Sequence, residues 1–293
     1  MQKFDYVRAG HITDAVSLLN EPGVKSRPLA GGTDLVLLLR LNEAVIDRVV
    51  DISLIPEMHA ISRSAGRVSI GAGATFKEVL DNPIVKSTAP LLAQACRAVG
   101  AVQIRNMGTL GGNVANAAAC ADSLPALVCL DASAHVQTPA GEAVMLVSEL
   151  VRAPNQTQIP PGGLLTALSY TVPPDGSRST FLKLGRRNAM AISRLSLAVL
   201  GRLDADGRIA EIRIVPGAAT PSLCRFTSVE TALLGQMPSA ELYETAARLT
   251  ADEMTRITGT RWSSEFKIPA LGAMVVRALE NVFGSTAVTP EGV

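Results

Sequence analysis

Two glycine-containing segments are the residues of this 293-residue chain best suited to binding chemistry. The first consists of Ala30, Gly31, Gly32, Thr33 and Asp34, between a predicted strand over residues 25–30 and a strongly apolar predicted helix over residues 35–40. Adjacent glycines can adopt positive φ, so successive backbone N–H groups can converge on a phosphate oxygen. The helix N-terminus adds its positive end at the same point. The segment therefore predicts a phosphate-binding turn, although any tight strand-to-helix turn can use two glycines.

The second segment is predicted as a glycine-rich loop and consists of Thr109, Leu110, Gly111, Gly112 and Asn113. Small residues follow it over 115–121 and would let another molecule approach the backbone closely. Asp122 comes next, at a predicted helix start, where it could accept a hydrogen bond from a ligand or act only as an N-cap. Neither segment fits GxGxxG or GxxxxGK[ST]. Two separate glycine nests predict a ligand with an extended diphosphate, of which FAD and other dinucleotides are the obvious class.

Other polar residues of the chain have more than one interpretation. Thr75 and Glu78 match a capping box at a helix start. The cationic group Lys183, Arg186 and Arg187 is either a solvated turn or a contact with a ligand or partner. The sequence has no GxSxG, HExxH or paired-carboxylate pattern, so no catalytic residue is assigned. A flavin carries its own redox chemistry and needs only to be held, oriented and tuned.

The positions of the cysteines and histidines and the net charge of the chain argue against several classes of function. The four cysteines and three histidines are scattered, so we expect no metal site and no disulfide framework. A net charge of +1 and a pI near 7.7 give no reason to expect nucleic acid as a partner. The apolar runs are too short to span a bilayer, and residues 1–10 lack the apolar core of a secretory signal. We expect a cytoplasmic protein with reduced thiols.

The order of predicted elements is mixed α+β. Helices are expected over 11–20 (capped by Thr13 or Asp14), over 89–99 (ending at Gly100) and from 122–125 onward. Strands are expected over 45–52, 67–74, within 134–147 and over 164–172, and a polar loop over 153–163. The turn at 173–176 predicts the main domain boundary. Beyond it we expect a strand over 180–184, a hairpin of strands 196–203 and 208–215, and helices from 227. One face of the last helix is predicted to carry Phe266, Leu271, Val275, Leu279, Val282 and Phe283.

Five motifs, taken together and in their order along the chain, resemble a known family, although no single motif is specific for it. They are AGGTDL (30–35), IGAGATFKEV (70–79), QIRNMGTLGGNVANA (103–117), DSLPALVCLDA (122–132) and KLGRRNAMAIS (183–193). Together they resemble the FAD-binding medium subunit of molybdenum hydroxylases, the family of xanthine dehydrogenase flavoprotein subunits and carbon monoxide dehydrogenase medium subunits. The resemblance implies a two-lobed FAD-binding domain of the vanillyl-alcohol-oxidase type over 1–175, with lobes of about 1–55 and 56–175. It further implies a smaller α+β C-terminal domain over 176–285 and a tail over 286–293.

The resemblance also implies a set of site residues around a non-covalent FAD. The two glycine segments should embrace its diphosphate and ribityl region, and Asp122 should hydrogen-bond the ribityl or flavin part. Leu164 or Leu165 and Lys183 should lie beside the isoalloxazine. The chain lacks the cysteine-rich insertion of a branch that resembles benzoyl-CoA reductase subunits, so we expect no iron–sulfur cluster of its own. Aromatic residues are only 3%, so stacking on the cofactor should come from aliphatic or backbone faces, or from a partner chain.

The function implied is that of an electron-transfer subunit in a larger molybdenum-dependent dehydrogenase. Its expected partners are a small subunit with two 2Fe–2S clusters and a large subunit with molybdopterin, in a dimer of heterotrimers. Electrons would pass from the clusters to FAD and on to an external acceptor. A stand-alone flavin oxidoreductase on the same fold is the first alternative, and a non-catalytic scaffold is the second. The sequence names neither the substrate nor the acceptor.

Overall fold

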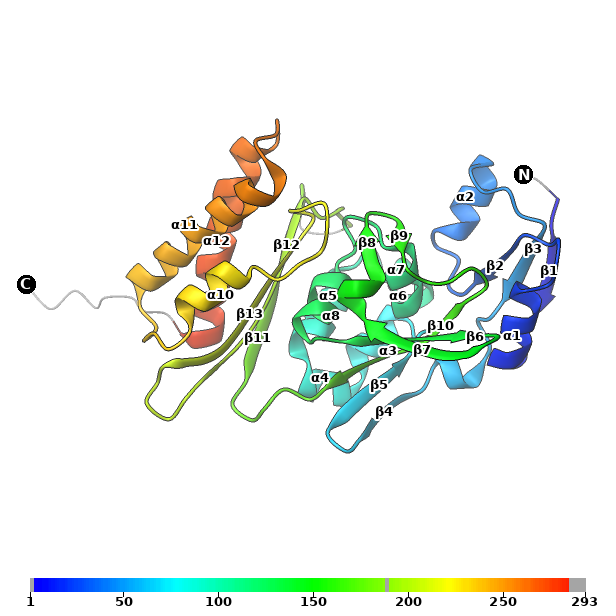
Figure 1. The fold of residues 1–293 in the computed structure, drawn as a ribbon, viewed down its shortest axis with the longest axis horizontal. Coiled ribbons are helices and arrows are strands. Elements are labelled where there is room, and N and C mark those ends of the chain that lie inside the picture. Colours follow the sequence, from blue (N-terminus) through cyan, green and yellow to red (C-terminus); the bar gives the residue numbers. More distant parts are fainter. Residues whose placement is uncertain (1–2, 188–189, 285–293) are drawn as a thin grey trace, which may run out of the picture.

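A small parallel sheet forms the N-terminal lobe of the computed structural model, which describes residues 3–187 and 190–284. Its strands are β1 (Asp5–Arg8), β2 (Ser26–Leu29) and β3 (Arg48–Asp51), in the order β1-β3-β2. Helix α1 (Ile12–Leu19) connects β1 to β2, and α2 (Leu35–Leu41) connects β2 to β3. Parallel strands need such crossovers because a tight turn can only reverse the chain. This lobe lies at the N-terminal end of the elongated molecule (Figure 1).

Buried Asp51 holds the end of β3 in place. Its carboxylate accepts hydrogen bonds from Arg8 Nε and the Ser53 N–H, both at 2.9 Å, and from the Tyr6 hydroxyl. Burial alone would raise the pKa of Asp51, but these hydrogen bonds outweigh burial and lower its pKa to about 2. The carboxylate is therefore a structural anchor that joins β1 to β3.

The second lobe is built on an antiparallel sheet with the strand order β4-β5-β10-β6-β7. These strands are β4 (Ile61–Ser64), β5 (Arg67–Gly71), β6 (Ser133–Thr138), β7 (Gly141–Leu146) and β10 (Leu164–Thr171). Between β5 and β6 lie the helices α3 (Phe76–Asp81), α4 (Pro83–Thr88), α5 (Pro90–Ala98), α6 (Val102–Met107), α7 (Leu110–Asn116) and α8 (Ser123–Cys129). Shorter elements complete it: η1 (Pro56–Met58), α9 (Val147–Leu150), β8 (Val151–Ala153) and β9 (Gln156–Thr157).

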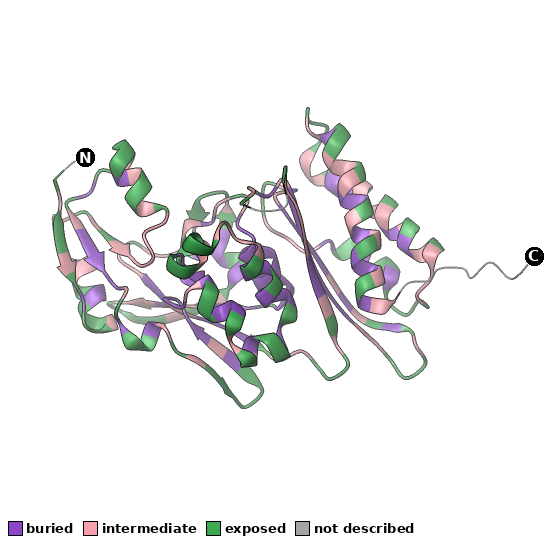
Figure 2. Ribbon diagram, turned by 180° about the vertical axis from the view of Figure 1, so that it is seen from behind, coloured by how far each residue is buried: buried purple, intermediate pink, exposed green. Residues whose placement is uncertain are grey.

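The C-terminal part is an antiparallel sheet of β11 (Arg178–Leu184), β12 (Leu195–Leu203) and β13 (Ile209–Gly217). Helices α10 (Thr227–Leu233), α11 (Ala240–Thr258) and α12 (Ser264–Phe283) follow it in the chain. Of these, α12 covers one face of the sheet, and α5 and α8 of the second lobe cover the other (Figure 1). Buried residues run along the sheet and the helices that face it (Figure 2).

Central strand β12 contributes to two hydrophobic cores at once. Leu197 and Val199 belong to the core shared with α10–α12, whereas Ala198 and Leu200 belong to the core of the second lobe. Successive side chains of a strand point to opposite faces, so both faces of β12 are buried and its sequence is a continuous apolar run. The C-terminal sheet is thus packed into the second lobe rather than merely attached to it.

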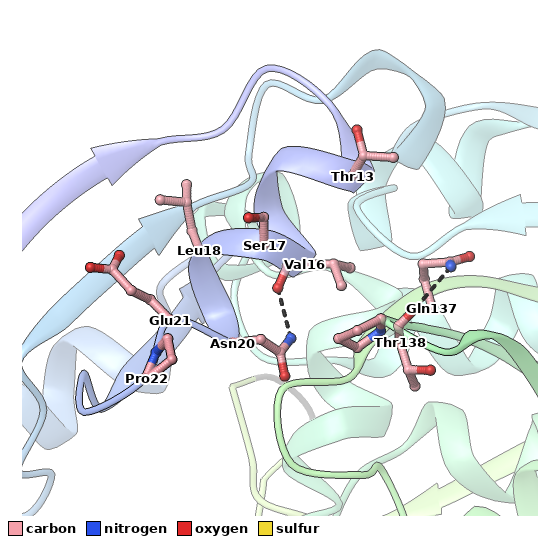
Figure 3. Close-up of a pocket in the computed structure, with 10 residues that line it drawn as sticks. Thr13, Val16, Ser17, Leu18, Asn20, Glu21, Pro22, Gln137 and Thr138 are labelled. Carbon is pink, nitrogen blue, oxygen red and sulfur yellow. Dashed lines mark hydrogen bonds between the residues drawn. The ribbon is translucent and has the colours of Figure 1, made fainter.

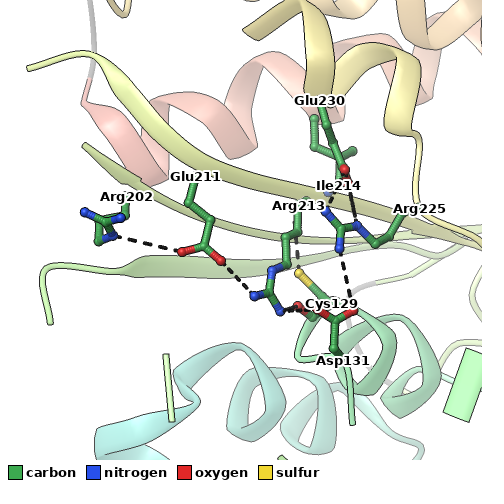
Figure 4. Close-up of polar contacts among 8 residues, drawn as sticks. All are labelled: Cys129, Asp131, Arg202, Glu211, Arg213, Ile214, Arg225 and Glu230. Carbon is green, nitrogen blue, oxygen red and sulfur yellow. Dashed lines mark hydrogen bonds and ion pairs between the residues drawn. The ribbon is translucent and has the colours of Figure 1, made fainter. Parts of the chain in front are cut away.

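Ion pairs also join the two parts (Figure 4). Arg213 of β13 contacts Asp131 through Nη1 at 2.8 Å and donates from the same nitrogen to the Cys129 carbonyl at 3.1 Å. Arg225 lies 3.6 Å from the same carboxylate and pairs with buried Glu230 at 2.8 Å. The end of α8 is therefore fixed to β13 by charge as well as by packing.

Most predicted elements are present, and four details of the prediction were wrong. The N-cap of α1 is His11, with no side-chain cap from Thr13 or Asp14. The segment 153–163 contains β9 instead of being a loop throughout. Residues 110–116, predicted as a loop, form helix α7. Phe266 is 44% exposed and lies outside the buried face of α12. The predicted capping box of Thr75 and Glu78 at the start of α3 is confirmed.

Candidate functional site

The first glycine segment is a turn whose backbone donors are free. Gly32 has φ of +70°, in the left-handed region that glycine adopts without strain. Gly31 packs so tightly against the 107–108 backbone that an added Cβ would lie 1.8 Å from the Met107 carbonyl oxygen. Within the part of the chain that the structure describes, the N–H groups of Gly31, Gly32 and Thr33 make no hydrogen bond. These donors precede the N-terminus of α2, which is the arrangement that binds a phosphate.

The second glycine segment is the first turn of a helix. Thr109 is the N-cap of α7, and its hydroxyl accepts the Gly112 N–H at 3.0 Å. Buried Gly111 donates to the Ala72 carbonyl at 2.9 Å, and an added Cβ there would lie 2.4 Å from Ala72 Cβ. Gly111 is therefore required by packing against the β5–α3 connection. Exposed Gly112 leaves the backbone of α7 open to a ligand.

A side-chain contact joins the two segments. Asn116, at the end of α7, donates from Nδ2 to Asp34 Oδ1 at 3.2 Å. Gly112 lies four residues earlier and so shares the face of α7 that is turned toward Asp34. Ala115, also exposed, adds a second small side chain beside it. The structure thus brings both predicted segments into one cradle with a bare helix face on one side and free N–H groups on the other.

Asp122 lies at the junction of the second lobe and the C-terminal part. It is at the N-cap position of α8, but its side chain makes no cap bond. Instead, Oδ2 accepts from Lys183 Nζ of β11 at 2.6 Å and Oδ1 accepts from the Ser193 hydroxyl at 2.5 Å. Lys183 Nζ also donates to the Ala98 carbonyl at 2.8 Å. The interpretation of Asp122 as a plain N-cap is therefore wrong, and its carboxylate binds the two parts of the chain together.

The electrostatics of this cluster are those of a buried ion pair. Asp122 is 5% exposed, and burial raises its pKa above the ordinary value although Lys183 and Ser193 act in the opposite direction. Burial raises the pKa of the nearby Cys120 thiol as well, and the charges of Asp122, Lys183 and Asp34 all reach it. Cys120 is therefore close enough to the Asp122 cluster and to the end of the first glycine segment to feel the charge of both.

Asn113 connects α7 to the start of α8. Its Oδ1 accepts a 2.6 Å hydrogen bond from the hydroxyl of Ser123, the residue after Asp122. The side chain of Asn113 is thus engaged by the protein and orients the two helices on which the cradle depends.

Leu164 and Leu165 are at the start of β10, and the structure buries both. They are 3% and 5% exposed and belong to the core of the second lobe. Strand β10 contacts α7, and its bulge between Leu165 and Ala167 lies beside Ala72, whose N–H donates to the Thr166 carbonyl at 2.9 Å. Their predicted contact with an isoalloxazine would involve the small part of their surface that stays exposed.

Ser193 is the residue of this site that the sequence did not reveal. It is separated from Asp122 by 71 positions and lies in no hydroxyl-dependent motif. Its only sequence signal is its place inside the segment KLGRRNAMAIS, of which Asn188 and Ala189 lie outside the described residues.

A cavity of about 700 Å³ lies away from this cradle (Figure 3). Helix α1, the residues that follow it and the β6–β7 turn line it with both polar and apolar side chains, among them Thr13, Val16, Ser17 and Thr138. Asn20 at its edge donates to the Gly162 carbonyl at 2.9 Å. This cavity is a gap where the N-terminal lobe meets the second lobe and contains neither glycine segment.

Two features that the described residues lack bear on the kind of site. Over residues 3–187 and 190–284, no three His, Cys, Asp or Glu side chains gather as metal ligands would. In the same described residues, no helix has the length and apolar character needed to cross a membrane.

A free-donor turn, a bare helix face and a buried aspartate between two α+β parts are features that a nucleotide cofactor could use. Comparison with known proteins gives the family. Residues 2–173 match the FAD binding domain in molybdopterin dehydrogenase, and residues 180–282 match the carbon monoxide dehydrogenase flavoprotein C-terminal domain. The chain belongs to this family of FAD-binding dehydrogenase subunits.

The similarity to known relatives and solved structures extends over nearly the whole length of this chain and of theirs. The glyceraldehyde dehydrogenase medium chain of Sulfolobus acidocaldarius is 29% identical over 281 residues, or 96% of this chain and 98% of the relative. The carbon monoxide dehydrogenase medium chain of Afipia carboxidovorans is 30% identical, covering 94% and 96%. A chain of reconstituted carbon monoxide dehydrogenase from Oligotropha carboxidovorans superposes with a TM-score of 0.89 at 26% identity, covering 96% and 98%.

These findings confirm the predicted family, the α+β fold class, the oxidoreductase class and FAD as the cofactor. The cradle fits this cofactor. The free N–H groups suit a diphosphate, and the exposed, side-chain-free face of α7 at Gly112 leaves room for an extended part of the cofactor.

Proposed function

We propose that this chain holds FAD non-covalently in the cradle and serves as the electron-transfer subunit of a molybdenum hydroxylase. The observation that carries the cofactor assignment is the pair of glycine segments joined by Asn116 and Asp34. The turn residues Ala30 to Asp34 would bind the diphosphate through N–H groups. Thr109, Gly111, Gly112 and Asn113 would shape the opposite wall.

The roles of the remaining predicted residues follow from their positions. Asp122, held by Ser193 and Lys183, would accept a hydrogen bond from the ribityl or flavin part with its remaining lone pairs. Lys183, with Leu164 or Leu165, would lie on the isoalloxazine side. When bound, FAD supplies the electron-accepting and electron-donating chemistry; the chain's own residues orient it and limit its contact with water.

Partner subunits are proposed from the relatives. Those relatives are medium chains and FAD-binding subunits of dehydrogenases, and the solved likeness is a carbon monoxide dehydrogenase. We propose a small subunit with 2Fe–2S clusters and a large subunit with molybdopterin, in a dimer of heterotrimers. Electrons would reach this chain from the clusters and leave to an external acceptor in the cytoplasm. The chain alone would hydroxylate nothing.

We also propose two domains, 1–175 with lobes of about 1–55 and 56–175, and 176–285. The two family matches, which end and begin on either side of residue 175, support this division. The proposed tail, 286–293, lies outside the described residues.

The test of the cofactor site is Gly112→Val. An added Cβ at Gly112 meets only Thr109 Oγ1, at 2.8 Å. The variant should therefore keep its main-chain conformation and lose only part of the Thr109 N-cap, which is worth about 1 kcal/mol of stability. Its side chain would occupy the exposed face of α7. Gly10→Val is the matched control, because Gly10 is exposed and an added Cβ there meets nothing nearer than 3.7 Å.

The readouts are flavin absorbance per chain and acid release of intact FAD. Wild type and Gly10→Val should carry about one FAD, and Gly112→Val should carry far less while its circular dichroism is unchanged. Equal FAD content in all three would reject the cradle. Flavin retained by the denatured chain would reject non-covalent binding, and hydroxylase turnover by the chain alone would favour a stand-alone flavoenzyme.

A further inference from the structure

The N-terminal lobe meets the second lobe through two helices that are held very differently. Helix α1 packs against β6 and β10 of the second lobe (Figure 1). Its buried residues Ala15 and Val16 belong to the same hydrophobic core as the second lobe. Asn20, at the end of α1, adds a hydrogen bond from Nδ2 to the Gly162 carbonyl at 2.9 Å. The α1 side of the lobe is therefore fastened by a shared core.

Helix α2 takes no part in that core. Its buried residue, Leu39, lies in a small core with Ile46 and Val49, and the residues packed against this core also come from the N-terminal lobe. Leu37 and Leu41 of the same helix are 55% and 56% exposed. Because apolar burial is the main force that holds elements together, the α2 side is fastened to the second lobe much more weakly than the α1 side.

The start of α2 is tied to the second lobe at the cradle itself. Gly31 packs on the backbone of Met107. Asp34, the N-cap residue of α2, accepts the 3.2 Å hydrogen bond from Asn116 Nδ2 at the end of α7. Asp34 is exposed and Asn116 is half-buried, so this hydrogen bond can break without disturbing either hydrophobic core.

The same hydrogen bond lies beside both surfaces that the proposed cofactor would use. Asp34 directly follows the free N–H groups of residues 31–33, and Asn116 lies one helical turn after exposed Gly112. A ligand held between these surfaces is released most easily when α2 moves away from α7. Domains commonly close around a ligand by a hinge motion, and here the firmly packed α1 side supplies the hinge. The contact between Asn116 and Asp34 opposes the opening.

On the basis of the proposed function, we propose that Asn116 is a positioning residue that retains FAD. Its amide holds the Asp34 carboxylate and thereby keeps the α2 side of the N-terminal lobe closed on the bound cofactor. Asn116 acts through Asp34 and not on the flavin. Its loss should therefore shorten the time for which FAD stays bound, since changes at one interface act mainly on the rate of dissociation.

The experiment measures the rate of FAD release from the full chain. Loaded chain is diluted into an excess of an apoflavoprotein that captures free FAD, and flavin fluorescence is followed. Asn116→Ala is made both in wild type and in Asp34→Ala. A reversed pair, Asp34→Asn with Asn116→Asp, exchanges donor and acceptor. Asn20→Ala is the matched control, because it removes the same kind of side chain from the contact with Gly162 on the α1 side.

Asn116→Ala should release FAD about threefold faster than wild type, as expected for the loss of one exposed hydrogen bond, with its melting temperature unchanged. In the Asp34→Ala background the same substitution should leave the rate unchanged, because its acceptor is already gone. The reversed pair should release FAD at nearly the wild-type rate. Asn20→Ala should lower the melting temperature and leave the release rate as in wild type.

Release at the wild-type rate from Asn116→Ala would overturn the retention role and leave the proposed function intact. Equal acceleration with and without Asp34 would also overturn it, since Asn116 would then act independently of that carboxylate. Acceleration by Asn20→Ala as large as that by Asn116→Ala would overturn the assignment of the opening to the α2 side. A wild-type chain that takes up no FAD would overturn the proposed function itself, and the retention role with it.

Discussion

Replacing Lys183 with methionine removes one half of the buried pair with Asp122. Asp122 is 5% exposed and the Lys183 side chain is 14% exposed, so solvent cannot compensate the charge that remains. Removing one partner of a buried pair costs about 3–5 kcal/mol. Methionine keeps the apolar stem, so the loss comes from the charge and not from a cavity. The free energy of unfolding at neutral pH should fall by about that amount.

The loss should depend on pH in a definite direction. Burial already raises the pKa of Asp122, and without Lys183 the folded-state pKa must rise further. The unfolded chain then releases the proton at lower pH than the folded chain does. Stability of the variant should therefore fall as pH rises above about 4, by up to about 1.4 kcal/mol per pH unit, until the folded-state pKa is passed. Near pH 4 the gap to wild type should be small.

The assay is urea unfolding of wild type and variant, followed by circular dichroism between pH 4 and pH 8. The double variant Asp122→Asn with Lys183→Met carries no charge at the site and should recover much of the stability with a flat pH dependence relative to wild type. Lys77→Met is the control, because the Lys77–Asp81 pair is exposed and should matter far less. A gap that is equal at both ends of the pH range, or a double variant no more stable than the single one, would refute the reasoning.

Three further predictions concern other residues. Asp51→Asn should cost up to about 2 kcal/mol above pH 4, because the Asp51 pKa is lowered to about 2, and the cost should disappear as pH falls toward 2; acid unfolding curves check this. Gly31→Ala should reduce soluble yield and melting temperature as well as FAD content, since its Cβ would overlap the Met107 carbonyl; normal melting would contradict the packing. Asp131→Asn should cost at most about 1 kcal/mol in low salt and less at 1 M NaCl, because its contact with Arg213 is half exposed; a larger, salt-independent loss would disprove a surface role.

The glycine spacing singled out two segments that the structure brings together, but it did not give the local structure of the second one. Gly31 and Gly32 interrupt a strand–helix pattern, and the structure has a turn with positive φ there. The pattern around Gly111 and Gly112 predicts a loop, and glycine is indeed a poor helix former. Tertiary packing overrides that preference, since only glycine at 111 allows α7 to contact Ala72. Such a contact joins residues 39 positions apart, and propensity carries no information about it.

The aspartate cluster was predictable in part. The sequence singled out Asp122 at a helix start and Lys183 in a cationic group, and a family resemblance gave both a place near the cofactor, but nothing local indicated that they would pair with each other. The pair forms because β11 packs on α5, which brings Lys183 to the Ala98 carbonyl and to Asp122 together. Phe266 shows the opposite error: its spacing fits the apolar face of α12, yet its side chain is 44% exposed and lies under the Arg194 guanidinium. Helical periodicity predicts which face a residue shares, not whether that face is covered along its whole length.

Central strand β12 has a consequence for how freely its sequence can change. Leu197 and Val199 serve one core and Ala198 and Leu200 serve another, so no side chain in this stretch points to solvent. A polar substitution at any of these positions meets an apolar environment, whichever face it is on. On β7, by contrast, no residue is buried. A saturation-mutagenesis map should therefore show uniform intolerance along 195–200 and broad tolerance along 141–146. The strand that joins the two parts of the chain is thus also a strand that tolerates few substitutions.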